Sequence, residues 1–254
     1  MLLQTKASDS YKEPQQPDPT LASEKPDQWV FANMDQLTSL VTSGSRGWAK
    51  YYSNSGSLFI RAQDINTDRL ILNDVAHVKL PSKAEGQRTR VCLNDLLVTI
   101  TGANVTKSAI VKSDLGEAYV SQHVALVRPV DPSIADYLYL WLLSPMHGRA
   151  KLLTEAYGAG KPGLNLDDIK EIVVSLPPLS EQQEIVRRVE DLFKLADTIE
   201  NRVAAGTHLA GRLTQAMLAK AFRGELVPTE AEMARRGGNL MPHSGTLYDD
   251  HTAI

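Results

Sequence analysis

Residues 176–190 read LPPLSEQQEIVRRVE, and this stretch decides how the chain is organised. The two prolines end any preceding strand, because proline cannot donate a hydrogen bond to a sheet and biases its predecessor away from helix. Ser180 is a favourable N-cap residue, and Gln183 completes the spacing of a capping box. Glu181 and Glu184 add negative charge where the positive end of a helix dipole would lie. The stretch therefore predicts that a helix begins at Ser180.

The residues that follow predict a long helix with a partner. Apolar side chains recur in alternating steps of four and three, the 3.5-residue repeat of a coiled-coil seam. The seam consists of Ile185, Val189, Leu192, Ala196, Ile199, Val203, Gly206, Ala210, Leu213 and Met217. At about 1.5 Å per residue, a helix from Ser180 to Phe222 is about 64 Å long. A domain of this size does not need such a helix for its own core, so we expect it to pack on something outside that domain.

The preceding residues, 28–177, predict an irregular mixed α/β domain, which gives the whole chain an α+β fold with a long coiled-coil helix. Short β-type runs such as HVALVRPV and EIVVSLP are separated by turn sequences such as NSGS and TGAN. A helix is expected after Asp131-Pro132, with Ser133 near its cap, and a second through RAKLLTEAYG. The long helix and its closing FRGELVP take residues 178–228.

Both ends of the chain predict disorder. Residues 1–27 contain several prolines and few large apolar side chains, so they cannot bury enough surface to offset the entropy of ordering. We expect them to form a disordered arm, and residues 229–254 to form a disordered tail.

Composition excludes several classes of function. The net charge of −3 gives no overall basic field, so any contact with nucleic acid has to come from local patches. The single cysteine, Cys92, rules out a disulfide framework and is interpreted as a small buried hydrophobe in a cytoplasmic protein. No apolar run approaches the ~18 residues of a membrane span. Scattered histidines and the lack of a phosphate-binding loop predict no metal, no cofactor and no catalytic activity.

Several motifs together resemble a known family. The helix-start motif and the closing AFRGELVP are similar to the conserved region of specificity (S) subunits of type I restriction-modification systems. Three upstream pieces, SGSRGWAKYYS with LFIRAQDIN, YVSQHVALVRP, and GLNLDDIKEIVVSLPP, resemble the target recognition domain that precedes such a helix. The resemblance covers about residues 28–228.

This resemblance implies a specific role. S subunits usually carry two target recognition domains and two conserved helices, whereas this chain has one of each and so resembles a half-subunit, natural or truncated. The family's function implies that the domain reads one half of a bipartite site in double-stranded DNA. The helix would act as spacer and docking platform for methyltransferase (M) subunits, and the family also works with restriction (R) subunits. A second copy of the chain, or another S chain, would supply the missing half.

Three loops are the candidates for DNA contact. The first, in TSGSRGWAKYY, combines cations and aromatic rings, and the second is the turn in TGANVTKSAIVK. The third is the glycine-rich YGAGKPGLN. The expected DNA-binding residues are Ser45, Arg46, Trp48, Lys50, Tyr51, Asn104, Thr106, Lys107 and Lys161. Arginine suits guanine and asparagine suits adenine, while lysine and serine more often hold phosphate.

Each loop also has a purely structural interpretation. The aromatic rings of the first loop could fold back into the core, the second could be a solvated hairpin tip, and the third could be a simple connection. The alternative for the whole chain is a coiled-coil scaffold that binds protein and shows no preference among DNA sequences.

Overall fold

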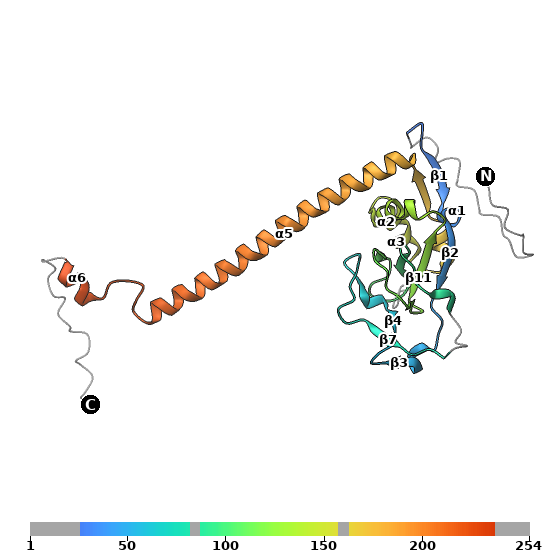
Figure 1. The fold of residues 1–254 in the computed structure, drawn as a ribbon. Coiled ribbons are helices and arrows are strands. Elements are labelled where there is room, and N and C mark those ends of the chain that lie inside the picture. Colours follow the sequence, from blue (N-terminus) through green and yellow to red (C-terminus); the bar gives the residue numbers. More distant parts are fainter. Residues whose placement is uncertain (1–25, 82–86, 157–162, 237–254) are drawn as a thin grey trace, which may run out of the picture. The chain divides into compact units, whose positions relative to one another are not determined.

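The computed structural model describes residues 26–81, 87–156 and 163–236, which fall into two compact units (Figure 1). The first unit ends at Val189 and the second begins at Glu190. The first contains short strands and short helices, and the second contains most of one long helix. The expected fold class, α+β with a long helix after a sheet-rich domain, is confirmed.

A four-stranded antiparallel sheet, the central sheet, organises the first unit. Its strands are, in spatial order, β2 (Thr38–Ser43), β11 (Val124–Pro129), β8 (Leu96–Thr99) and β9 (Ser108–Ile110). Successive side chains of a strand point to opposite faces. Leu96 and Val98 belong to one hydrophobic cluster and Leu97 to another, so both faces of the central sheet are buried. Burial on both faces explains why the two inner strands, β8 and β11, are rich in consecutive apolar residues.

Helices cover one face of the central sheet. They are η5 (Pro132–Ile134), α2 (Ala135–Leu143), α3 (Gly148–Glu155) and α4 (Leu166–Lys170). Their buried side chains Leu138, Leu142, Leu152 and Ile169 join Leu96 and Val98 in the larger cluster. The Asp131 carboxylate accepts the backbone N–H of Ser133 at 2.9 Å, so Asp131 is the cap where Ser133 was expected.

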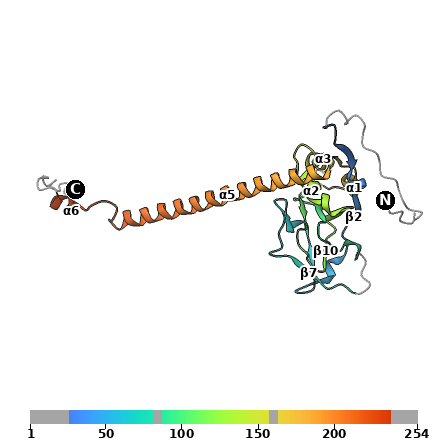
Figure 2. The ribbon, with the colours of Figure 1, turned by 45° about the horizontal axis from the view of Figure 1, so that its top comes forward.

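A second four-stranded sheet packs against the other face. Its order is β10 (Ala118–Val120), β4 (Ser57–Ile60), β7 (Ala76–Val78) and β3 (Tyr52–Ser53), with β10 and β4 parallel. Ile60 and Val120 meet Leu126 of the central sheet in the second cluster. Figure 2 shows α2 and α3 at the opposite end of the first unit from β7, as Figure 1 does.

Two short strand pairs and several single turns complete the first unit. β1 (Val30–Asn33) pairs with β12 (Val173–Leu176), and β5 (Ile65–Asn66) pairs with β6 (Arg69–Leu70). The remaining turns are α1 (Met34–Leu37), η2 (Trp48–Tyr51), η3 (Ala62–Asp64) and η4 (Gln87–Thr89).

The long helix α5 (Leu179–Phe222) begins one residue before the predicted Ser180. The carbonyl of Pro178 accepts the backbone N–H groups of Glu181 and Gln182 at 2.9 and 3.0 Å. The Gln182 side chain is only 4% exposed, and its amide donates to the carbonyl of Pro177 at 2.8 Å. Gln182 therefore ties the first turn of α5 to the proline pair, a bond that the cap-based prediction did not include.

The apolar seam of α5 changes character along the helix. Ile185, the first seam residue, is partly buried against the larger hydrophobic cluster of the first unit. Beyond Val189 the seam is uncovered, with Leu192, Val203 and Leu213 exposed by 64%, 62% and 59%. Large apolar side chains at helical spacing normally face a partner, and the pairing of this stretch stays a prediction.

One stretch of the predicted tail is helical. α6 (Glu230–Arg236) lies within the residues 229–254 that were expected to be disordered. The backbone N–H of Thr229 donates to the Glu232 carboxylate at 3.1 Å, and the N–H of Glu232 donates to the Thr229 carbonyl at 2.9 Å. This local pairing at the start of a helix is the signal that the compositional argument missed. The expected arm 1–27 lies, except for its last two residues, outside the described residues.

Cys92 is exposed, so its interpretation as a buried hydrophobe was wrong. Just before it, the chain forms a single bridge between Arg90 and Tyr119. The chain then turns through Cys92 and Asn94, whose φ is +68°, before β8 begins. The Asp95 carboxylate holds this turn by accepting the backbone N–H of Cys92 at 2.7 Å.

Adjacent leucines of α3 test the assignment of the core. Leu152 is 0% exposed and Leu153 is 58% exposed. Leu152→Ala should lower the free energy of unfolding by about 2–5 kcal/mol, because it leaves a cavity in the larger cluster. Leu153→Ala makes the same chemical change on the surface and should cost less than about 0.5 kcal/mol. Urea denaturation measures both, and equal losses would contradict the placement of α3.

Candidate functional site

The first candidate loop follows β2 and is held tightly against the second sheet. The backbone N–H of Gly44 donates to the carbonyl of Ser121 at 3.2 Å. A Cβ atom at Gly44 would lie only 2.1 Å from the carbonyl oxygen of Val120, so a side chain has no room there. Gly47, three residues further along the loop, has a φ of +81°, a backbone conformation that favours glycine. The path of this loop is therefore fixed at both glycines.

Trp48 anchors the same loop from inside. Its side chain is 4% exposed, and its ring centroid lies 5.6 Å from that of Phe59 and 5.3 Å from that of Tyr119. Such aromatic pairs stabilise a fold beyond the area that they bury. For Trp48 the structure thus matches the interpretation in which aromatic residues fold back into the core. Its packed ring holds the backbone of the neighbouring loop residues in place.

The cations of this loop stay on the surface. Arg46 and Lys50 are exposed, while Ser45 and Tyr51 are half-buried. The Lys50 ammonium lies 5.0 Å from the centroid of the Tyr51 ring, within range of a cation–π contact. The predicted residues Ser45, Arg46, Lys50 and Tyr51 are therefore brought together on a rigid turn.

Arg88, which was not among the predicted residues, contacts the strand that leads into this loop. Its Nε donates to Oγ1 of Thr42, the residue two before Gly44, at 3.2 Å. Arg88 and Arg90 are exposed, whereas Thr89 between them is 0% exposed. The sequence RTR carries no signal for this arrangement, because all three residues are polar and the burial of Thr89 arises from the fold. Arg46, Lys50 and Arg88 are called the cationic surface below.

The second candidate loop is packed inward. Thr106 is 2% exposed, and the amide of Asn104 donates to the carbonyl of Ala62 at 3.2 Å. Lys107 pairs with the Asp68 carboxylate at 3.2 Å. Thr106 therefore has no surface to offer to DNA, while Asn104 and Lys107 are engaged within the protein. Lys161 of the third loop lies outside the described residues.

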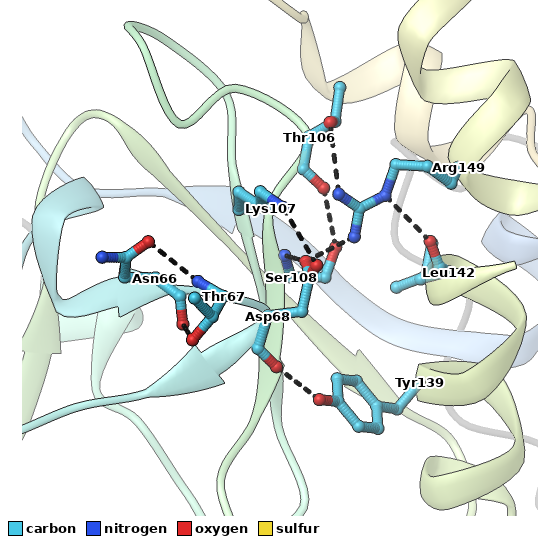
Figure 3. Close-up of polar contacts among 9 residues, drawn as sticks. All are labelled: Asn66, Thr67, Asp68, Thr106, Lys107, Ser108, Tyr139, Leu142 and Arg149. Atoms are coloured by element: carbon cyan, nitrogen blue, oxygen red, sulfur yellow. Dashed lines mark hydrogen bonds and ion pairs between the residues drawn. The ribbon is translucent and has the colours of Figure 1, made fainter. Parts of the chain in front are cut away.

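Asp68 is the centre of the network that holds the second loop (Figure 3). Its carboxylate accepts the backbone N–H of Ser108 at 2.9 Å and pairs with Lys107 and with Arg149 of α3. The Tyr139 hydroxyl donates to the Asp68 carbonyl. Three elements distant in sequence thus meet at one aspartate. Sequence analysis missed this residue, because a lone aspartate in a turn carries no signal of distant partners.

The surroundings of Asp68 shift its pKa. Burial raises the pKa of this carboxyl, but the hydrogen bonds from Arg149, Ser108 and Lys107 outweigh burial and hold it below its ordinary value. The ionised form is therefore the one that the fold stabilises.

Among the described residues, no group of three or more His, Cys, Asp and Glu side chains could hold a metal ion. None of the helices within those residues is long and apolar enough to cross a membrane.

Comparison with known proteins points to one family. A family model described as the type I restriction modification DNA specificity domain matches residues 52–205. The type I restriction enzyme EcoBI specificity subunit of Escherichia coli is 39% identical over 172 residues, which cover 67% of this chain and 36% of that protein. The EcoKI specificity subunit of Escherichia coli strain K12 is 31% identical over 212 residues, covering 80% and 44%.

A solved structure of a type I restriction-modification system contains a chain of the same fold. It aligns with a TM-score of 0.64 at 20% identity and covers 83% of this chain and 49% of that one. The chain spans less than half the length of each of these relatives.

Asp68→Asn should destabilise the protein at neutral pH, by about 1–3 kcal/mol, because it weakens charge-assisted hydrogen bonds to Arg149 and Lys107. A carboxyl with a depressed folded pKa contributes stability above its unfolded pKa of about 3.9 and loses it as pH falls through the folded value. The difference between variant and wild type should therefore shrink below about pH 4.

Denaturation at a series of pH values measures this difference. The control is Asp74→Asn, which removes the same charge from an exposed position. A constant difference between Asp68→Asn and wild type from pH 7 to pH 3 would show that the carboxylate is not the anchor.

Proposed function

The chain belongs to the type I restriction-modification DNA specificity family, and from that membership we propose that it is the non-catalytic subunit that reads one half of a bipartite DNA site. The match over residues 52–205 carries the proposal, because it spans most of the sheet-rich unit and more than half of α5. In this role the chain selects the sequence, and M subunits docked on it methylate the DNA. R subunits would join the same complex.

The cationic surface supports a role in DNA recognition. Arg46, Lys50 and Arg88 are exposed on a chain whose net charge is −3, so they attract phosphates locally and not through an overall field. The backbone of Arg46 and Lys50 is held by Gly44 and by the buried ring of Trp48, while the Arg88 side chain is held by its hydrogen bond to Thr42. A rigid support lowers the entropy cost of binding, which favours specific contact over loose attraction. We assign Arg46 to a base edge and Lys50 with Arg88 to the phosphates.

The uncovered seam of α5 supports pairing of two chains. Beyond Val189, five large seam side chains are uncovered, each exposed by about half or more: Leu192, Ile199, Val203, Leu213 and Met217. Two copies related by a two-fold axis, with antiparallel helices, would cover both seams at once. Such a pair reads two inverted half-sites that are separated by between one and two turns of DNA, at about 34 Å per turn.

Single substitutions should separate base contacts from phosphate contacts. In the complex with M subunits, Arg46→Ala should relax preference at one position of each half-site. Arg88→Ala should instead weaken binding to all sequences alike and lower the slope of log affinity against log salt by about one per contact. In-vitro selection and binding titrations at several salt concentrations measure both effects.

The control for the Arg46→Ala and Arg88→Ala variants is Lys151→Ala, which removes an exposed cation already paired with Glu155. It should change neither sequence preference nor salt slope. If Arg46→Ala left every position of the selected motif unchanged, the assignment of Arg46 to a base edge would be wrong. Salt-insensitive binding by the wild-type complex, without sequence preference, would favour the scaffold alternative.

The seam is tested by placing the same charge on two faces of α5. Val203→Glu lies on the seam and should separate the paired chains, because burying an unpaired carboxylate at a helix interface is costly. Ala205→Glu lies two residues away on the outer face and should leave the pair intact. Sedimentation velocity measures the oligomeric state, and a wild-type chain that stays monomeric at micromolar concentration would contradict homodimer pairing.

A further inference from the structure

The tip of the hairpin β5–β6 has an unusual backbone. Asn66 pairs directly with Arg69, so the connecting loop is the two residues Thr67 and Asp68. Both have positive φ, +51° and +58°. Turns of this kind are normally filled by Asn-Gly or Asp-Gly, because a left-handed residue with a side chain costs about 1–2 kcal/mol. The hairpin thus holds the strained, β-branched Thr67 beside Asp68, whose residue type tolerates this conformation better, where glycine would fit without cost.

The surrounding structure keeps this strained tip in place. The Asp68 carboxylate is bound by Ser108, Lys107 and Arg149, and the Asp68 carbonyl accepts the Tyr139 hydroxyl (Figure 3). Arg149 is only 11% exposed, so this anchor lies inside the first unit. Strain of this kind persists where the surroundings over-determine a conformation, and it is concentrated at functional sites. The network therefore fixes one hairpin tip more firmly than a surface turn requires.

The anchored tip exposes two side chains that can form hydrogen bonds, Asn66 and Arg69. Asn66 and Arg69 are both exposed, and as a cross-strand pair their Cβ atoms lie about 5 Å apart. The backbone N–H of Thr67 donates to Oδ1 of Asn66 at 2.9 Å, which orients the amide. In Figure 3 the amide nitrogen of Asn66 points away from the network.

These residue types match the chemistry of the DNA major groove. Asparagine can hold adenine through two hydrogen bonds, since its oxygen accepts from N6 and its nitrogen donates to N7. Oδ1 of Asn66 keeps a second lone pair for this purpose beside its bond to Thr67. Arginine holds guanine in the same bidentate manner, and a two-stranded ribbon fits within the groove.

We propose that the β5–β6 hairpin is a base-reading element, in which Asn66 and Arg69 contact base edges and Asp68 is the positioning residue. This inference rests on the proposed function, because it names a second reading element in the same DNA-binding chain. The hairpin is separate along the chain from the loop that carries Arg46.

The test uses the complex of the chain with its M subunits and in-vitro selection on randomised duplex DNA. Asn66→Ala and Arg69→Ala should each lose roughly ten- to a hundredfold discrimination at one position per half-site. Arg69→Lys keeps the charge but not the bidentate geometry. It should lose the same base preference while retaining the salt slope of the wild type. Lys151→Ala again serves as the surface control.

The positioning role of Asp68 is tested with a variant that relieves strain. Asp68→Gly removes the carboxylate anchor but accepts the left-handed backbone without cost, so the hairpin can still form. It should lose discrimination at the positions read by Asn66 and by Arg69 together. A structural role alone would leave the selected motif unchanged in any variant that folds, so wild-type discrimination in Asp68→Gly would overturn the positioning role.

Failure of this inference is distinguishable from failure of the proposed function. A wild-type complex that selects a motif, combined with Asn66→Ala and Arg69→Ala complexes that select the same motif equally strongly, overturns the hairpin assignment alone. A wild-type complex that selects no motif overturns both.

Discussion

Burial of both faces of the central sheet is the constraint on which the rest of the first unit depends. Leu96 and Val98 face the helices, and Leu97 faces the second sheet, so neither layer can shift without opening a hydrophobic cluster. The first two candidate loops connect elements of these layers, and they inherit fixed endpoints from them. The loop after β2 is pinned by Gly44 against β10, and the loop before β9 is pinned by Asp68 against α3. Interiors packed to this density do not deform continuously, which is what a surface that distinguishes bases requires.

Under the proposed function, residues of the first unit fall into supports, which hold the backbone, and readers, which would contact DNA. Trp48 and Asp68 are buried or half-buried and hold the backbone. Arg46 and Asn66, the proposed readers, each lie two residues before one of these supports and are exposed. A reader placed two residues from a buried or half-buried support would have a rigid base at little cost in accessible surface. The same logic applies to α5, where the buried Gln182 fixes the first turn and the exposed seam follows.

Sequence reasoning predicted the parts of the fold that local chemistry controls. Two prolines and a 3.5-residue repeat are local signals, and α5 was placed to within one residue at each end. The buried ring of Trp48, the inward packing of Thr106 and the exposed Cys92 were not predictable in this way, because each depends on contacts from distant elements. Asp68 gives the clearest case, since its partners Lys107 and Arg149 lie about 40 and 80 residues further along the chain. The sequence shows that a loop contains a cation, but it does not show whether that cation faces solvent or pairs with an aspartate.

The central claim is that two copies of this chain read two identical half-sites at a distance set by the paired helices. Co-expression of the chain with its M subunits in a host without other methylation, followed by sequencing of the methylated DNA, tests that claim most directly. The account predicts an interrupted palindrome, with the two half-sites separated by a fixed number of unspecified bases. An asymmetric motif would mean that a different recognition domain completes the complex, and it would contradict the account, as would the absence of any methylated motif.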